Sequence, residues 1–368
     1  MRSGQILGAE ALIRWIHPEK GLIPPLDFLP SIEGTELEIQ IGDWVNNQAL
    51  EQIETWEDQG VHLEISVNIA SHHLQSESFV EQLTAALEIH SKVKSQQLQL
   101  EVLESSALSD LSIISDIIEQ CQSELGVSVA LDDFGTGYSA LTHIRDLSAN
   151  VIKIDRTFVR DILIDPSDYS IIEGIISLAH AFNHKIIAEG VEFTEQGLML
   201  IIMGSDEAHG YGISRPLPVK QFEQWLEDYS PNPEWLQYAE LAESLSLQDK
   251  RRMLLQLTIK HWYSNILFLT ESGLTDLKVT RCHLSIWFDR LRNEKLFTES
   301  WLDEVKQHHD ALFSLARELV KTTQNQQGIS HSPSSVDQFK AAYHDLNQLL
   351  SPETVPVESK IITATANK

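Results

Sequence analysis

The sequence has few cysteines, few basic residues and no long apolar run, and each shortage excludes a class of protein. Its two cysteines, Cys121 and Cys282, cannot make a disulfide framework, which favours an intracellular protein. Only 27 lysines and arginines stand against 54 acidic residues, and the net charge of −27 argues against a nucleic-acid polymer as partner. No stretch approaches the roughly 18–20 apolar residues of a membrane span, and the N-terminus lacks a signal-peptide profile. We therefore expect a cytoplasmic protein without a membrane span.

The chain divides into an α/β part and an all-α part. Strand-like runs alternate to about residue 228 with helical patterns at 43–59, 77–90, 110–124 and 169–183, which predicts a parallel sheet with crossover helices. Ser230-Pro231-Asn232-Pro233 then breaks the pattern. Beyond it, apolar residues at helical spacing over 251–270, 281–293, 298–323 and 335–350 predict a helical bundle. We expect domains at residues 1–229 and 251–350, a linker at 230–250 and a flexible tail at 351–368.

Six apolar runs each end in a residue that can bind metal or handle a proton. The runs are ILGAE, LEISVN, LQLE, VSVALDD, VIK and KIIAE, and they end in Glu10, Asn68, Glu101, Asp132 with Asp133, Lys153 and Glu189. In a closed parallel barrel, the carboxyl ends of all strands open on one face, where these side chains would converge. Carboxylate and amide oxygens beside an ammonium indicate a hard-cation site for metal-assisted chemistry.

Each of these signals also has a purely structural interpretation. The alternatives are a solvated turn at residues 132–135, a strand lysine Lys153 paired with Asp155, a turn-forming Asn68, surface loop acids at Glu189 and Glu192, and a helix-capping Glu104. The recurrence at strand ends favours a site, because every structural alternative would have to coincide with all the others.

These motifs resemble, in order and spacing, those of the EAL-domain cyclic-di-GMP phosphodiesterases. The matching segments, over roughly residues 4–228, are Glu10-Ala11-Leu12 followed by Ile13-Arg14-Trp15, SVNIA around Asn68, Glu101-Val102-Leu103-Glu104, DDFGTGYSAL from Asp132, KIDRTFV from Lys153, AEGVE from Ala188 and HGYGISRPLP from His209. The resemblance implies a modified TIM barrel, a role in bacterial second-messenger signalling, a homodimer, and hydrolysis of cyclic-di-GMP to 5′-pGpG with two Mg²⁺ or Mn²⁺ ions.

The resemblance also implies a role for each matched residue. Glu10, Asn68, Glu101 and Asp132 match the ligands of one metal ion, and Asp132, Asp133 and Glu189 match those of a second. The catalytic set is Lys153, which matches the lysine that orients or deprotonates the attacking water, together with Glu10 and Glu189. The substrate-binding set is Arg14, Asp133, Glu192 and His209, and Glu104 matches the acid that steadies the loop after Asp132.

The sequence departs from the family at two places. Family members usually carry an antiparallel strand with Tyr-Gln-Pro ahead of the Glu-Ala-Leu strand, and this sequence starts after that point. We therefore expect a barrel whose first antiparallel strand is missing, which would expose sheet edges. The chain is then either a truncated product, or another segment or subunit fills the gap. The family's glutamine before Gly-Tyr is His209 here. A cyclic-di-GMP receptor that does not hydrolyse its ligand is the alternative, and a structural partner-binding module is a third interpretation.

The C-terminal region is similar to a degenerate chemoreceptor zinc-binding domain, a four-helix bundle with three His ligands and one Cys ligand. The similarity lies in the segment CHLSIWF from Cys282 and in the paired histidines near residue 308. Cys282 and His309 match zinc ligands, and His261 or His308 are candidate substitutes, while two family histidine positions hold apolar residues. A structural zinc site requires four ligands. The sequence therefore favours a bundle core with a buried free cysteine over a zinc site.

Overall fold

A computed structural model of the chain describes residues 1–107, 111–136, 147–205, 207–272, 284–325 and 333–352, and it divides into two compact units. The first, called the barrel unit here, comprises Met1–Arg160, Ile171–Glu192 and Gly204–Asn232. The second, the helical unit, comprises Asp161–Ser170, Phe193–Met203 and Pro233–Lys368. Among the described residues, no helix is long and apolar enough to cross a membrane.

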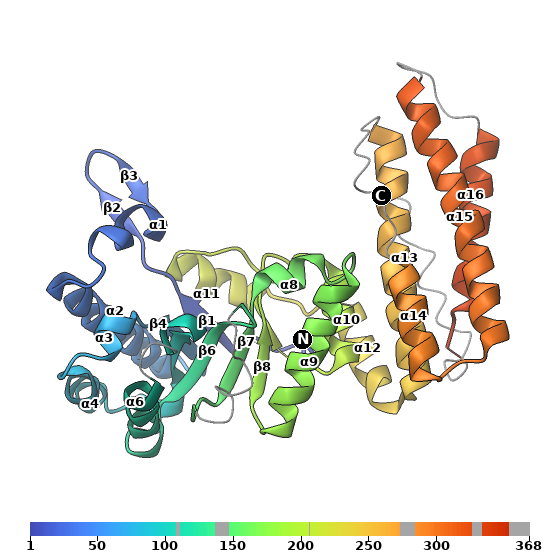
Figure 1. Cartoon of the computed structure of the whole chain (residues 1–368). Coiled ribbons are helices and arrows are strands. Elements are labelled where there is room, and N and C mark those ends of the chain that lie inside the picture. The colour runs from blue at the N-terminus through green and yellow to red at the C-terminus, as the bar shows by residue number, and fades with distance from the viewer. Residues whose placement is uncertain (108–110, 137–146, 206, 273–283, 326–332, 353–368) are drawn as a thin grey trace. The chain divides into compact units, whose positions relative to one another are not determined.

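The barrel unit is built on a seven-stranded sheet in the order β1-β4-β5-β6-β7-β8-β9, with every neighbouring pair parallel (Figure 1). The strands are β1 Gly8–Ala11, β4 Glu64–Asn68, β5 Leu98–Leu103, β6 Ser128–Phe134, β7 Val151–Ile154, β8 Lys185–Ala188 and β9 Glu207–Ala208. Within the described residues, β1 and β9 are the two edges. The sheet and its flanking helices match the expected modified TIM barrel.

Helices separate the strands, as the alternation of the sequence predicts. They are α2 Glu36–Asp58, α3 Ser71–Leu74, α4 Phe79–Ile89, α5 Glu104–Ala107, α6 Leu111–Ser123, α8 Arg156–Asp161, α9 Pro166–Ala181, α10 Thr194–Met203 and α11 Val219–Asp228, with a 3-10 turn η2 at Ser95–Gln97. α2 buries Ala49, Leu50 and Ile53 on the face that packs against β4 and α4. It begins at Glu36 rather than at residue 43, because acidic side chains in its first turn favour a helix N-terminus.

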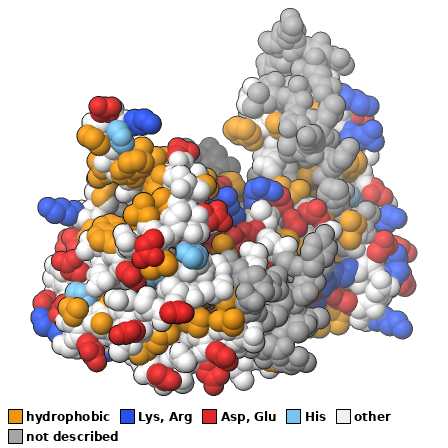
Figure 2. Space-filling model, turned by 60° about the vertical axis from the view of Figure 1, so that its left-hand side comes forward, with side chains coloured by type: hydrophobic (Ala, Val, Ile, Leu, Met, Phe, Trp, Pro, Cys, Tyr) orange, Lys and Arg blue, Asp and Glu red, His pale blue; other side chains and the backbone are white. Residues whose placement is uncertain are grey.

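A small hairpin, absent from the sequence-based expectations, projects from the barrel unit. Its strands β2 Trp15–His17 and β3 Gly21–Ile23 pair antiparallel, and α1 Pro25–Phe28 and the 3-10 turn η1 Leu29–Ser31 follow. Ile16 is 80% exposed and Leu26 is 86% exposed. Figure 2 shows hydrophobic side chains gathered on this projection, at the upper left.

The helical unit contains α12 Pro233–Ser244, α13 Leu247–Ser272, α14 Leu284–Glu294, α15 Glu299–Asn325 and α16 Pro333–Leu349. It also takes in α10 and the first turn of α9, and α10 packs on α12 and α13. Residues 230–250, expected as a linker, include α12 and the first turn of α13. This segment is ordered because Trp235, Ala239 and Ala242 form a buried face on α12.

Candidate functional site

Lys153 on β7 is the centre of the polar cluster at the carboxyl ends of the strands. Its side chain is fully buried, with Nζ 2.8 Å from Oε1 of Glu101, 3.1 Å from Oδ1 of Asp132 and 2.6 Å from Oε1 of Glu189. These carboxylates come from β5, β6 and the residue after β8, so neighbouring strands present them on the same face of the sheet. The partners of Lys153 are therefore these three acids, and the alternative pairing with Asp155 is wrong.

Burial and charge shift the pKa values of these groups in different directions. Burial alone would lower the pKa of Lys153, but Glu101, Glu189 and Asp132 together raise it above its ordinary value. Burial raises the pKa of Glu101 to about 7 and that of Glu189 to about 8, while the Lys153 ammonium opposes both shifts. Both carboxyl pKa values thus stay above the ordinary range even beside the Lys153 ammonium, and a further cation at the cluster would lower them.

Glu10 extends the cluster along β1. The side-chain amide of Asn68 donates a hydrogen bond of 2.7 Å to Oε1 of Glu10, and Nδ1 of His209 lies 3.9 Å from Oε2 of Glu10. Burial and the nearby Lys153 ammonium lower the pKa of His209. The segment that carries His209 lies close to the backbone after β8, because a Cβ on Gly210 would lie only 2.2 Å from the Val191 carbonyl oxygen. Only glycine fits there.

Asp132 and Asp133 both reach the site because the strand is irregular at this point. The pairing of β6 with β7 shifts register between Leu131 and Phe134, and Asp133 has φ of +54° in the left-handed region. This bulge interrupts the alternation that would send neighbouring side chains to opposite faces. One ligand atom from each of Asp132, Asp133 and Glu189 lies within 4.8 Å of the others, so these three acids can hold a metal ion.

Asp155 also lies at the site. The sequence analysis considered this residue only as a structural partner of Lys153. Burial, together with the neighbouring Asp155 side chain, raises the pKa of Asp133 to about 6. The backbone N–H of Thr157 donates a bond of 2.9 Å to Asp155 Oδ1, and the Thr157 hydroxyl donates to the same atom. The sequence does contain a signal for Asp155 as a site residue. It lies two residues after Lys153, which places both side chains on one face of β7 and its extension.

The remaining predicted residues lie at different distances from this cluster. Glu104, the first residue of α5, is buried, and its Oε2 accepts a 2.9 Å hydrogen bond from the backbone N–H of Gly135. Arg14 is exposed between β1 and β2, and its guanidinium donates to the Ile13 carbonyl at 2.8 Å. Glu192 is exposed in the segment after β8. The structure thus brings Glu104 to the loop after Asp132 and leaves Arg14 and Glu192 at the surface.

The donor set fits hard divalent cations. Within the described residues, Oε2 of Glu101 is buried and accepts no hydrogen bond, although Oε1 of the same carboxylate pairs with Lys153. A buried carboxylate oxygen without a donor is costly unless a cation satisfies it. Carboxylate and amide oxygens are the ligands that hard divalent cations prefer.

The proposed zinc ligands of the helical unit are only partly within the described residues. Cys282 lies outside them. The imidazole of His309 lies against the rings of Phe288 and Phe313, and His261 forms a hydrogen bond with Asn265. His308 is half-buried and its Nδ1 pairs with a backbone carbonyl of its own helix. In the part of the chain that the structure describes, the acids Asp132, Asp133 and Glu189 form a group that could hold a metal ion.

A parallel sheet flanked by helices, with a lysine enclosed by acids at the strand ends, defines a barrel-type α/β protein with an acidic group that could hold a metal ion. The model of the EAL domain matches residues 1–216, more than half of the 368 residues, and the chain belongs to the EAL domain family.

Curated relatives and a solved structure are similar to the same part of the chain. The bifunctional diguanylate cyclase/cyclic di-GMP phosphodiesterase MucR of Pseudomonas aeruginosa is 40% identical over 220 residues, which is 60% of this chain and 32% of MucR. Cyclic di-GMP phosphodiesterase PdeR of Escherichia coli is 36% identical over 226 residues, 61% of this chain and 34% of PdeR. This chain therefore spans about a third of the length of these relatives. The solved complex of the PaMucR phosphodiesterase with c-di-GMP superposes with a TM-score of 0.56 at 40% identity, covering 59% of this chain and 87% of that one.

Proposed function

We propose that the chain is a phosphodiesterase that opens one phosphodiester bond of cyclic-di-GMP and releases linear 5′-pGpG. The observation that carries the proposal is the convergence of Glu101, Asp132 and Glu189 on Lys153, with a buried carboxylate oxygen of Glu101 that accepts no hydrogen bond within the described residues. Relatives named as cyclic-di-GMP phosphodiesterases, at 36–40% identity, support the choice of substrate.

The acids of the cluster would hold two Mg²⁺ or Mn²⁺ ions. Glu10, Asn68, Glu101 and Asp132 are the proposed ligands of one ion, and Asp132, Asp133 and Glu189 are those of the other. Such ions, when bound, lower the pKa of a water molecule and neutralise charge that develops on phosphorus. The excess of negative charge around the single ammonium of Lys153 supports this assignment, because it disfavours the cluster without added cations.

Lys153 is the proposed proton-handling residue. Its Nζ is fixed by three carboxylates on neighbouring strands, which restricts the direction in which the ammonium can donate a hydrogen bond. In this position it orients the attacking water and carries a proton at Nζ, with Glu10 and Glu189 beside it. The burial of the side chain excludes bulk water from the same atom.

The substrate is proposed to lie over the cluster with its phosphates toward Arg14 and His209. An exposed guanidinium is free to turn toward a phosphate, with which it forms charge-assisted hydrogen bonds. Asp133 and Glu192 complete the proposed substrate-binding set, and Glu104 keeps the loop after Asp132 in place through the Gly135 N–H.

Three further properties are proposed from the sequence and its relatives rather than from the site. A homodimer and a cytoplasmic location follow from the family resemblance and the low cysteine content. For the histidines of the helical unit we propose packing rather than zinc ligation. The contact of His309 with Phe288 and Phe313, together with burial that lowers its pKa, supports a neutral core imidazole.

A receptor that binds cyclic-di-GMP without hydrolysis is the second candidate, favoured by His209 at the family's glutamine position and by the unpaired edge of β1 among the described residues. Incubation of the purified chain with cyclic-di-GMP and Mg²⁺ or Mn²⁺, followed by chromatography, separates the two. The proposal expects 5′-pGpG that disappears when a chelator is added. Binding measured by calorimetry without any product would establish the receptor instead.

A further inference from the structure

His209 lies beside Glu10, although the two residues come from opposite edges of the sheet. Among the described residues, β1 and β9 are the edge strands, and His209 directly follows β9. Its Nδ1 nevertheless lies 3.9 Å from Oε2 of Glu10 on β1. Both residues are half-buried and both belong to the barrel unit. The curvature of the sheet therefore brings an imidazole to the acidic cluster at the carboxyl ends of the strands.

The main chain of His209 is fixed to the segment that carries Glu189. The backbone N–H of His209 donates a 2.8 Å hydrogen bond to the Ala188 carbonyl, and its carbonyl accepts a 2.9 Å bond from the Val191 N–H. These two bonds lie on either side of Glu189 in the sequence. A side chain on a main chain held in this way is positioned before any ligand binds, which favours a defined binding geometry.

The separation between His209 and Glu10 fits a pair of metal ligands. At 3.9 Å, Nδ1 of His209 and Oε2 of Glu10 are too far apart for a hydrogen bond. Two ligand atoms that each lie about 2.1 Å from one ion are about 3 to 4 Å apart. The other oxygen of Glu10 accepts the 2.7 Å hydrogen bond from the Asn68 amide. Oε2 is therefore the carboxylate oxygen that could share an ion with the imidazole.

Glu101 provides an independent observation that points to a cation at the same place. It lies opposite Asn68 in the register of β4 and β5, and it is only 1% exposed. Its Oε2 accepts no hydrogen bond from the described residues. A buried carboxylate oxygen of this kind is costly unless a positive charge satisfies it. Glu10, Asn68 and Glu101 come from three adjacent strands of the sheet, and His209 approaches the first of them.

We propose that His209 is a nitrogen ligand of the ion held by Glu10, Asn68 and Glu101, and that it makes this site select transition-metal ions such as Mn²⁺ over Mg²⁺. Mg²⁺ binds oxygen ligands and gives up its water reluctantly, whereas an imidazole nitrogen is a softer donor that suits transition metals. This inference deepens the proposed phosphodiesterase function and rests on it for the presence of the metal site. Its test measures metal binding rather than turnover.

The first experiment loads the full chain with Mn²⁺ and records the electron spin echo modulation of the ion, which reports nitrogen nuclei bound to it. We expect coupling to an imidazole nitrogen, and a change of this coupling when only the histidines carry a heavy nitrogen isotope. His209→Gln replaces the imidazole with an amide and should abolish the coupling. The matched control is His90→Gln, because His90 also pairs with a carboxylate of the barrel unit, Glu54 at 2.9 Å. The control should keep the coupling.

The second experiment measures the affinity for each ion by calorimetry. We expect His209→Gln to weaken Mn²⁺ binding about 10-fold and to change Mg²⁺ binding by less than about 3-fold, because only the transition metal gains from the nitrogen ligand. His90→Gln should change neither affinity. If His209→Gln proves unfolded by circular dichroism, His209→Asn replaces it with the same expected direction.

The outcomes separate this inference from the proposed function. No imidazole coupling in the unaltered chain, or an equal loss of affinity for both ions in His209→Gln, would overturn the inference even if the chain hydrolyses cyclic-di-GMP. His209 would then remain a contact to the substrate phosphates. Imidazole coupling that depends on His209, in a chain that releases no 5′-pGpG, would support the inference and overturn the proposed function.

Discussion

The Nζ atom of Lys153 lies 2.6 Å from Oε1 of Glu189, in an ion pair that joins β7 to the segment after β8 and is shielded from water on the lysine side. Burial raises the pKa of the glutamate to about 8 even beside this ammonium. The pair is therefore not an isolated salt bridge. It belongs to a cluster in which three carboxyl groups surround one ammonium. We expect additional positive charge to stabilise this cluster.

The first prediction concerns the stability of the cluster without its lysine. Lys153→Met leaves the three carboxylates around it without their buried cation, and removal of one partner from such a pair costs about 3–5 kcal/mol. We expect this loss in urea unfolding with a chelator and a partial recovery with Mn²⁺, because the metal supplies the missing charge. Lys92→Met, which removes an exposed ion pair with Asp58, is the control and should not change stability measurably. Equal stability of Lys153→Met and the unaltered chain in the chelator would contradict the account.

The second prediction concerns Glu104, whose Oε2 accepts the 2.9 Å bond from the Gly135 N–H. Glu104→Ala removes this acceptor and lets the loop after Asp132 move, which misplaces two metal ligands. We expect kcat to fall roughly 10- to 100-fold, in the range that small misplacements cost. Glu104→Gln keeps an oxygen at the same position and should retain more activity than Glu104→Ala. Steady-state kinetics of the two variants checks this order, and equal activities would show that the bond does not hold the loop.

The third prediction concerns pH and the helical unit. Burial alone would raise the pKa of Glu195, but Lys260, 3.1 Å away, holds it below its ordinary value of 4.5. Because the folded pKa is the lower one, the pair stabilises the fold above pH 4.5, and this contribution is lost as the pH falls through the folded pKa. The stability difference between the unaltered chain and Glu195→Gln should therefore shrink from pH 6 to pH 3. A difference that stays constant in urea unfolding across this range would contradict the assignment.

The fourth prediction concerns Cys121. Its side chain is fully buried on α6, and burial raises the pKa of the thiol to about 11. In a Cys282→Ser variant, which leaves Cys121 as the single thiol, a thiol reagent at pH 8 should react only after the chain is unfolded. Rapid reaction of the native variant would show that α6 opens readily or packs differently.

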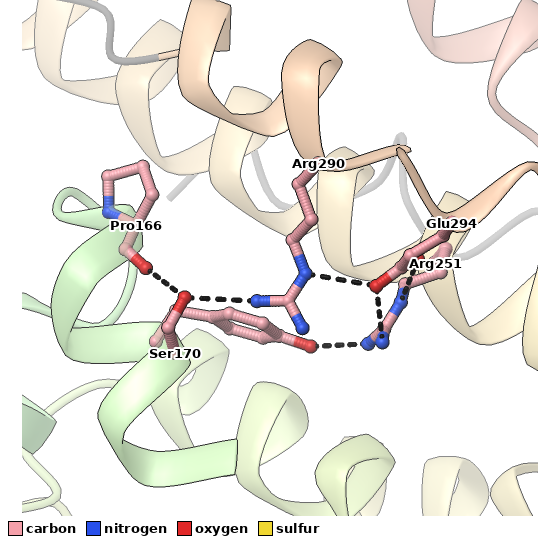
Figure 3. A network of polar contacts seen from close by, with 6 residues as sticks. Pro166, Ser170, Arg251, Arg290 and Glu294 are labelled. Carbon is pink, nitrogen blue, oxygen red and sulfur yellow. Dashed lines mark hydrogen bonds and ion pairs between the residues drawn. The ribbon is translucent and has the colours of Figure 1, made fainter. Parts of the chain in front are cut away.

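The parts of the fold that the sequence predicts are those with a local signal. Apolar runs that end in acids predict both the sheet and the polar cluster at the carboxyl ends of its strands. Parallel strands end at the same edge of a sheet, and alternate residues of a strand share one face. The β2–β3 hairpin has strands of only three residues, too short for a periodic signal. The position of Asp133 in the site depends on the bulge in β6, which the sequence does not reveal. The hydrogen bond from Arg251 to the Tyr169 hydroxyl joins residues 82 apart in the sequence, and only the folded chain shows it (Figure 3).

The central claim is that the acids around Lys153 bind the metal ions that hydrolyse cyclic-di-GMP, and Glu189→Gln tests it most directly. The matched control is Glu64→Gln on the same face of the sheet near its amino-terminal end, where the carboxylate only accepts a bond from Gln99 within the described contacts. The measurement is formation of 5′-pGpG as a function of Mn²⁺ concentration for the three chains. The account predicts metal-dependent product from the unaltered chain and Glu64→Gln, and a loss of roughly 100-fold or more in Glu189→Gln. Undiminished, metal-dependent turnover in Glu189→Gln would contradict it.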